Sequence, residues 1–230
     1  MKLQCENVMV RPGGVHEDFI LGPVNLEIVP GLITGLVGRN GSGKTTLLRI
    51  LAGRLLPEEG SVHKDKGRVN LVGGPMRDWL LRKPDDLADA VALFEPWFDK
   101  AFFQKQMARF GISRENAGIY ASSGEQKIYL LLFELARKPD ILLLDEPTSG
   151  LTPTARHAVL DLLQEYMEDE NHSLVFSTHI TADLDRIADR IVFLDNGQIR
   201  FDDEKEALRE RMAMPGEELP SIAEMMERFS

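Results

Sequence analysis

A run of small and polar residues between two apolar segments could hold a phosphate chain. It reads Gly38-Arg39-Asn40-Gly41-Ser42-Gly43-Lys44-Thr45-Thr46 and fits the spacing G-x-x-x-x-G-K-[ST]. Glycines let the backbone wrap phosphates with its N–H groups turned inward, Lys44 adds a positive charge, and the Thr45 hydroxyl is placed to bind Mg²⁺. The alternative is a glycine-rich turn before an ordinary helix. The flanking pattern favours a nucleoside triphosphate site formed by Gly38, Asn40, Gly41, Ser42, Gly43, Lys44, Thr45 and Thr46.

Acidic residues and a histidine follow two further apolar runs. Asp145 and Glu146 come directly after residues 141–144, and His179 comes shortly after residues 173–177. At the carboxyl edge of an open α/β sheet, where ligands bind, Asp145 would organise Mg²⁺ and Glu146 would polarise a water in line with the terminal phosphate. His179 would donate a hydrogen bond to the same phosphate. The alternative is a strand that simply ends in two solvated acids, beside an incidental histidine.

Apolar periodicity predicts the strands and helices that position these residues. The predicted strands are residues 3–10, 24–28, 32–37, a short pair around 61–62 and 68–72, then 141–144, 173–177, and a hairpin of 191–195 and 198–201 around Asn196-Gly197. The predicted helices are residues 44 to near 53, the nearly all-apolar 128–136, then 153–168, a segment with the stripe Ile180, Leu184, Ile187 and Ile191, and an acid-rich 202–211. This alternation is typical of an α/β protein.

The pattern changes between residues 76 and 118. Apolar residues recur there at helical intervals without a convincing strand, which predicts a helical lobe inserted into the α/β core. Trp79 and Trp97 both fall in this lobe, where core packing or a partner-facing patch is favoured over base stacking. The tail 212–230 is expected to form a small helix packed on the core or to touch a partner.

Composition narrows the class of protein. The chain of 230 residues has a formal charge of −10, which argues against nucleic acid as a main partner. Cys5 is the only cysteine, so no internal disulfide forms, and a buried thiol in the first strand is expected. No signal-peptide pattern or long apolar stretch occurs, which predicts a cytoplasmic protein.

Several motifs together resemble the ATP-binding-cassette (ABC) ATPases. The stretch 136–151, which reads ARKPDILLLDEPTSGL, looks like the family core. Residues 121–125, Ala-Ser-Ser-Gly-Glu, fall where the family carries its L-S-G-G-Q signature at the start of a helix, and His179 falls at its switch histidine. The resemblance covers nearly the whole chain. Residues 96–111 and 176–180 further resemble bacterial exporter cassettes that pair with a separately encoded permease.

The family implies a fold and a division of the chain. The fold is α/β, a P-loop NTPase core with a mixed sheet, an antiparallel β subdomain and an inserted helical lobe. Residues 1–230 would form one ABC ATPase domain. Residues 1–75 and 137–211 would make the nucleotide-binding core, residues 76–136 the lobe with the signature helix, and residues 212–230 the tail.

The family also implies a mechanism and partners. Two cassettes close head to tail on two ATP molecules, and Ser122 and Gly124 at a helix N-terminus face the partner's ATP. Thr45 and Asp145 would hold Mg²⁺, and Lys44, Glu146 and His179 would be catalytic. The resemblance implies a second cassette, in a homodimer or heterodimer, and an integral membrane permease, with no nucleic acid. The protein would lie in the cytoplasm, peripheral at the inner face of the cell membrane.

Several positions depart from the family pattern. Gly73 or Gly74 stands where a glutamine should touch Mg²⁺, and Pro12 lies where an aromatic ring should stack on adenine. Phe19 and His16 are the candidates to replace that ring, although packing between loop and core is favoured for Phe19. Thr152 replaces an aspartate that contacts the opposite site. In the signature, Ser123 replaces a glycine and Glu125 a glutamine. These changes predict slow or partner-dependent hydrolysis.

The leading hypothesis is therefore the ATPase subunit of a transporter, an exporter by resemblance. One alternative is a regulatory module that binds ATP with little turnover. Another is a soluble cassette ATPase without a transport role. The transported substrate is invisible in this sequence, because specificity lies in the permease.

Overall fold

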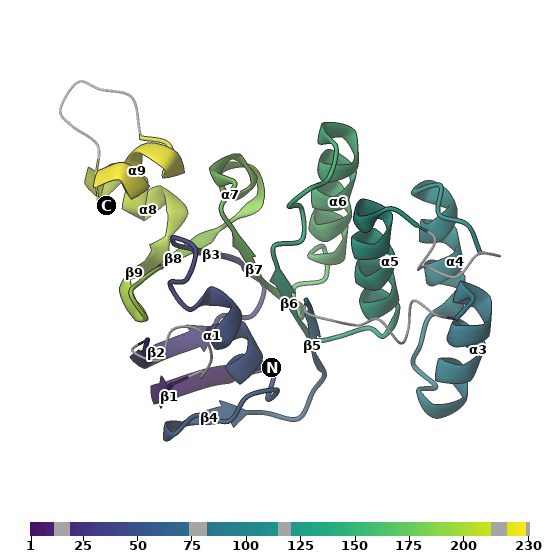
Figure 1. The fold of residues 1–230 in the computed structure, drawn as a ribbon, viewed down its shortest axis with the longest axis horizontal. Helices are drawn as coiled ribbons and strands as arrows, with labels where there is room; N and C mark the ends of the chain where they lie inside the picture. Colours follow the sequence, from purple (N-terminus) through teal and green to yellow (C-terminus); the bar gives the residue numbers. More distant parts are fainter. Residues whose placement is uncertain (12–18, 74–81, 115–120, 213–219, 229–230) are drawn as a thin grey trace.

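The computed structural model describes residues 1–11, 19–73, 82–114, 121–212 and 220–228. In chain order the strands are β1 Leu3–Val10, β2 Leu21–Ile28, β3 Ile33–Val37, β4 Glu59–Lys64, β5 Val69–Val72, β6 Ile141–Asp145, β7 Ser173–Thr178, β8 Arg190–Asp195 and β9 Gln198–Glu204. The helices are α1 Lys44–Leu51, α3 Pro84–Phe94, α4 Lys100–Arg109, α5 Ser123–Ala136, α6 Pro153–Tyr166, α7 Thr181–Ile187, α8 Lys205–Met212 and α9 Ile222–Arg228. The order of elements is drawn in Figure 1.

The main sheet carries the predicted chemistry at one edge. Within the described residues it has six strands in the order β5-β6-β7-β3-β8-β9, and only β9 runs antiparallel to its neighbour. The central strands β3 and β7 are buried throughout, as their apolar sequences predict for a parallel sheet covered on both faces. Because β6, β7 and β3 are parallel neighbours, their carboxyl ends meet, with Asp145 beside Ser177 and Val37 beside Thr178.

A second sheet is antiparallel and packs against the first through α1. Its three described strands have the order β2-β1-β4. Their apolar side chains form one core with α1 and with one face of the main sheet, through residues such as Leu3, Leu47, Leu143 and Val175. Figure 1 shows α1 between the two sheets. The mixed sheet and antiparallel subdomain are therefore confirmed.

The predicted pairing of residues 61–62 with 68–72 is wrong. Strand β4 pairs with β1, whereas β5 pairs in parallel with β6. The physical reason lies in the side chains: β4 is partly exposed and polar and closes the edge of the small sheet, while Leu71 and Val72 of β5 are buried in the main one.

The helical lobe extends from α3 to α5 at one end of the molecule (Figure 1). Its centre is aromatic: Phe103 and Phe133 lie edge to face with ring centroids 5.7 Å apart, and Tyr129 packs edge-on against Phe103 at 5.8 Å. Trp97 is 44% exposed, and the guanidinium of Arg68 lies 5.4 Å from its ring centroid. Trp79 lies outside the described residues.

One boundary near the carboxyl terminus differs from prediction. Asp202 belongs to β9, not to a helix, because its carboxylate pairs with Arg190 of β8 at 2.5 Å, and α8 begins only at Lys205. Ile191 lies on β8, in agreement with the predicted strand 191–195, and α7 ends at Ile187, so the apolar stripe of residues 180–191 spans a helix and the strand after it. The hairpin around Asn196-Gly197 is confirmed, with both residues at positive φ as a tight turn of this type requires.

The tail packs on the core as one of the two expected outcomes. Ile222 and Met225 of α9 are buried and belong to the main hydrophobic core, and α9 contacts α7 and α8. None of the helices in the described ranges is long and apolar enough to cross a bilayer.

Candidate nucleotide site

The glycine-rich segment forms the loop between β3 and α1. Gly43 caps α1 in a left-handed conformation (φ 106°) without a side-chain hydrogen bond, which leaves the first N–H groups of α1 available to an anion. A Cβ on Gly38 would lie 2.0 Å from the carbonyl oxygen of Leu194, so this position accepts only glycine. The loop therefore has the backbone form of a phosphate cradle.

Lys44 lies within this cradle. Its ammonium donates to the carbonyls of Gly38 at 2.7 Å and Arg39 at 2.9 Å, and the residue is only 7% exposed. Burial lowers the pKa of Lys44, and the nearby carboxylates of Glu146 and Asp145 oppose that shift. The two carboxylates thus act on the same ammonium that would bind a terminal phosphate.

The two predicted metal-binding residues lie in contact. The Thr45 hydroxyl donates to Asp145 Oδ2 at 2.8 Å, although the two residues are far apart in the sequence. Ser177 donates to Asp145 Oδ1 at 2.7 Å, a partner that the sequence analysis missed and that the parallel register of β6 with β7 creates.

This pair suits Mg²⁺ bound together with phosphate. No group of three or more His, Cys, Asp or Glu that could hold a metal occurs in the part of the chain that the structure describes. Mg²⁺ is commonly bound by one or two protein oxygens together with substrate phosphates and waters. One hydroxyl and one carboxylate beside a phosphate cradle fit that pattern.

Glu146 and His179 also lie together. Glu146 Oε2 is 2.7 Å from His179 Nδ1, and the side chains are 25% and 54% exposed. Glu146 has a φ of 52°, a left-handed conformation that costs free energy in a residue with a Cβ. Its N–H donates to the Ser177 hydroxyl at 3.0 Å, which helps to hold this backbone. The predicted base and histidine therefore form one unit at the sheet edge.

The signature segment forms the start of α5. Ser122 is the N-cap, and its hydroxyl accepts from the Glu125 N–H at 3.3 Å while Glu125 accepts from the Ser122 N–H at 2.8 Å. Hydrogen bonds to the Glu125 carboxylate from the Ser122 hydroxyl and from the Ser122 N–H lower the pKa of Glu125. Ser122 and Glu125 thus form a capping box. Ser122 is exposed and Gly124 half-buried, and their contact with a partner's ATP stays a prediction.

The structure shows the contacts made at some of the positions that depart from the family pattern. Gly73 follows β5, and a Cβ there would lie 2.7 Å from Asp145 Cβ, so the backbone passes close to the candidate metal ligand. Thr152 is the N-cap of α6 and accepts from the Ala155 N–H at 3.3 Å. Phe19 is half-buried, and a Cβ on Gly43 would lie 3.0 Å from the Phe19 ring atom Cζ. Pro12, His16 and Gly74 lie outside the described residues.

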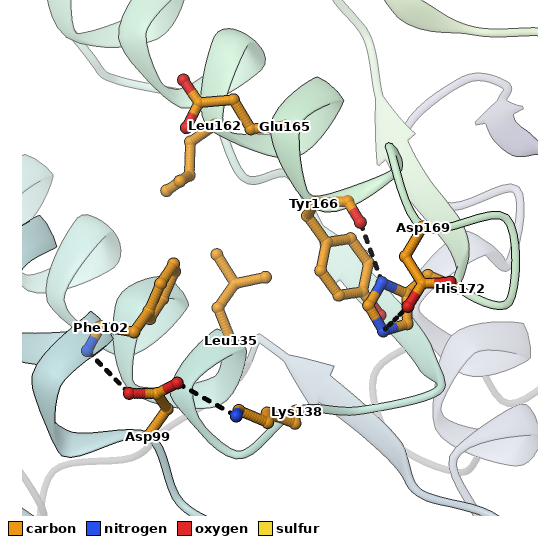
Figure 2. Close-up of a pocket in the computed structure, with 9 residues that line it drawn as sticks. All are labelled: Asp99, Phe102, Leu135, Lys138, Leu162, Glu165, Tyr166, Asp169 and His172. Atoms are coloured by element: carbon orange, nitrogen blue, oxygen red, sulfur yellow. Dashed lines mark hydrogen bonds and ion pairs between the residues drawn. The ribbon is translucent and has the colours of Figure 1, made fainter.

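A separate cavity of about 300 Å³ lies between α4, the end of α5, α6 and the turn before β7 (Figure 2). Its apolar wall contains Phe102, Leu135 and Leu162, and the stacked rings of Tyr166 and His172 have centroids 4.2 Å apart. None of the predicted nucleotide or catalytic residues lines it. The candidate site is therefore the open carboxyl edge of the main sheet, not this cavity.

Comparisons with known proteins agree on one family. The family model described as "ABC transporter" matches residues 21–149. The ABC transporter ATP-binding protein YtrB of Bacillus subtilis is 31% identical over 78% of this chain, and the aliphatic sulfonates import ATP-binding protein SsuB of Ralstonia nicotianae is 32% identical over 80%. The matches span 65% and 66% of those two proteins, so this chain covers just under two thirds of their length.

Solved structures share the fold. One described as the ATP-binding subunit of an ABC transporter has a TM-score of 0.82 at 20% identity, with 99% of each chain covered. A nucleotide-free ATP-binding cassette has a TM-score of 0.74 at 19% identity and covers 94% of this chain and 96% of its own. At this identity the likeness concerns the fold alone, and it agrees with the expected fold class.

Proposed function

We propose that this chain, which belongs to the ABC transporter family, is the subunit that binds and hydrolyses ATP to power a membrane transporter. The observation that carries the proposal is the meeting of two pairs, Thr45 with Asp145 and Glu146 with His179, beside the Lys44 cradle. A turn before an ordinary helix would not require these pairs at the adjoining strand ends.

The arrangement suggests a role for each side chain. Lys44 and the free N–H groups of α1 bind the phosphates. Thr45 and Asp145 would hold Mg²⁺, which neutralises phosphate charge. The Glu146 carboxylate accepts a proton from the attacking water. A doubly protonated His179 would donate to that carboxylate through Nδ1, which holds it in place, and toward the phosphate through Nε2.

We further propose the assembly that the family implies. Ser122 and Gly124, at the capped N-terminus of α5, face the ATP of a second cassette, and an integral membrane permease completes the transporter. The chain then works in the cytoplasm, at the inner face of the membrane. The core of residues 1–75 and 137–211, the lobe 76–136 and the tail 212–230 are the parts of this single domain. Exporter direction stays a prediction, since relatives such as SsuB are named for import.

The test compares three substitutions in the purified chain, alone and with its permease and a co-expressed cassette. Glu146→Gln should lower kcat by about a hundredfold or more while calorimetry shows unchanged ATP affinity, because it removes a proton acceptor and no phosphate contact. Lys44→Ala should lose ATP binding. Glu168→Gln, at an exposed position after α6, is the matched control and should leave both unchanged.

Two results would overturn the proposal. Unaltered turnover in Glu146→Gln would show that Glu146 is not the base. Unaltered ATP affinity in Lys44→Ala would show that the loop around Lys44 does not bind the phosphates. A Cβ at Gly73 would lie 2.7 Å from Asp145 Cβ, so this backbone has no room for a glutamine side chain at that position. The missing glutamine favours one second candidate, a regulatory module that closes on ATP with little hydrolysis. That candidate gains support if the wild-type chain binds ATP yet hydrolyses none in every assembled state.

A further inference from the structure

The loop that follows the candidate base is held by a short series of backbone contacts. The Ser149 N–H donates to the Glu146 carbonyl at 3.4 Å, and the Leu151 N–H donates to the Thr148 carbonyl at 3.2 Å. These are long bonds, and the loop starts at a left-handed residue that carries a Cβ. Groups outside the loop must therefore contribute to holding it.

Lys127 supplies such a group from α5. Its ammonium donates to the Ser149 carbonyl at 2.6 Å and lies 3.4 Å from the Glu146 carbonyl. Lys127 is half-buried, and a hydrogen bond from a charged donor is stronger than one between neutral groups. One side chain thus contacts the carbonyls at both ends of the turn 146–149.

A second contact lies one turn earlier on the same helix. A Cβ on Gly124 would lie 3.2 Å from Leu151 Cδ2, so the backbone of the first turn of α5 packs on the far end of the loop. Lys127 and Gly124 are three positions apart and therefore lie on one face of the helix. This face of α5 therefore contacts Glu146, Ser149 and Leu151 of the loop.

We propose that Lys127 is a positioning residue that joins loop 146–151 to the first turns of α5. It fixes the left-handed backbone of Glu146, and hence the direction of its carboxylate, relative to the helix end that carries Ser122. The consequence rests on the proposed function. The carboxyl edge of the main sheet, where this chain binds ATP, and the N-terminus of α5, which faces a second cassette, move as one body. Lys127 touches no reacting atom and acts through the loop.

The first test needs no nucleotide. Hydrogen exchange of the free protein is followed for peptides covering residues 146–151, with α6 as the internal reference. Lys127→Met keeps the chain length of the side chain and removes its donors. We expect amides of the loop to exchange about tenfold faster, while those of α6 stay unchanged. Lys105→Met, at an exposed position on α4, is the matched control and should change neither. If Lys127→Met does not fold, Lys127→Gln replaces it.

The second test separates positioning from binding. In the assembled ATPase, Lys127→Met should lower kcat about tenfold and change KM by less than about twofold, since it misdirects Glu146 and leaves the phosphate cradle intact. Lys127→Arg, which retains donors, should recover most of kcat. Loop exchange within about twofold of wild type, or a kcat equal to that of Lys105→Met, would overturn the inference. A wild-type chain that neither binds nor hydrolyses ATP would contradict the proposed function instead, and the exchange result would still decide the role of Lys127.

Discussion

The strongest stability prediction concerns a buried carboxylate beside the candidate site. Asp183 on α7 is fully buried, and its two oxygens accept from the Thr148 hydroxyl at 2.6 Å and from Arg156 Nε on α6 at 2.5 Å. Arg156→Met keeps most of the aliphatic side chain and removes the guanidinium. The carboxylate is then left with one neutral donor in a site without water exposure.

The magnitude follows from this geometry. Removal of one partner from a buried ion pair costs about 3 kcal/mol, at the lower end of the usual range because Thr148 still donates. For a chain of this size each kcal/mol shifts Tm by about 2–4 °C, so Arg156→Met should melt about 6–12 °C lower. Thermal unfolding followed by circular dichroism, with urea unfolding as a second measure, tests this value.

An exposed pair between the same two helices provides the control. Arg186 of α7 pairs with Asp161 of α6 at 2.5 Å, and their side chains are 35% and 47% exposed. Arg186→Met should therefore cost less than about 1 kcal/mol. Adding Asp183→Asn to Arg156→Met should recover part of the loss, because it neutralises the unpaired charge. Equal losses in the two arginine variants, or no recovery in the double variant, would refute the reasoning.

Two further predictions concern buried titratable groups. Burial raises the pKa of the Cys5 thiol to about 11, so Cys5 should resist alkylation at pH 8 in the native protein and react on unfolding in urea; rapid native labelling would contradict this. Burial also raises the pKa of Glu134 above its usual 4.5, partly opposed by Arg137. The folded state then holds this proton to higher pH than the unfolded state, and its contribution to stability is lost as pH rises through the raised pKa. The Tm of Glu134→Gln minus that of wild type should accordingly increase from pH 4 to pH 7, and a flat difference would count against a raised pKa.

Local pattern determined much of the fold. The strands 3–10 and 141–144 and the helix from Lys44 appear where apolar periodicity and glycine punctuation predicted them, because these signals depend on neighbours a few residues away. The helix predicted from residue 202 failed for a nonlocal reason. An acid-rich segment suits a solvated helix, but pairing with β8 and Arg190 extends it as a strand.

Some residues of the candidate site could likewise be predicted from local motifs, whereas their long-range contacts could not. The sequence by itself predicted the phosphate cradle and singled out the acids after residue 144 and the histidine after residue 178, since each is a short motif of fixed spacing. Only the tertiary structure decided that Ser177 holds Asp145, that Lys127 holds the loop after Glu146, and that β5 leaves β4 to pair with β6. Those contacts join residues far apart in the chain, and which distant groups meet is set by the order of strands in the sheet and by the way the helices pack upon it.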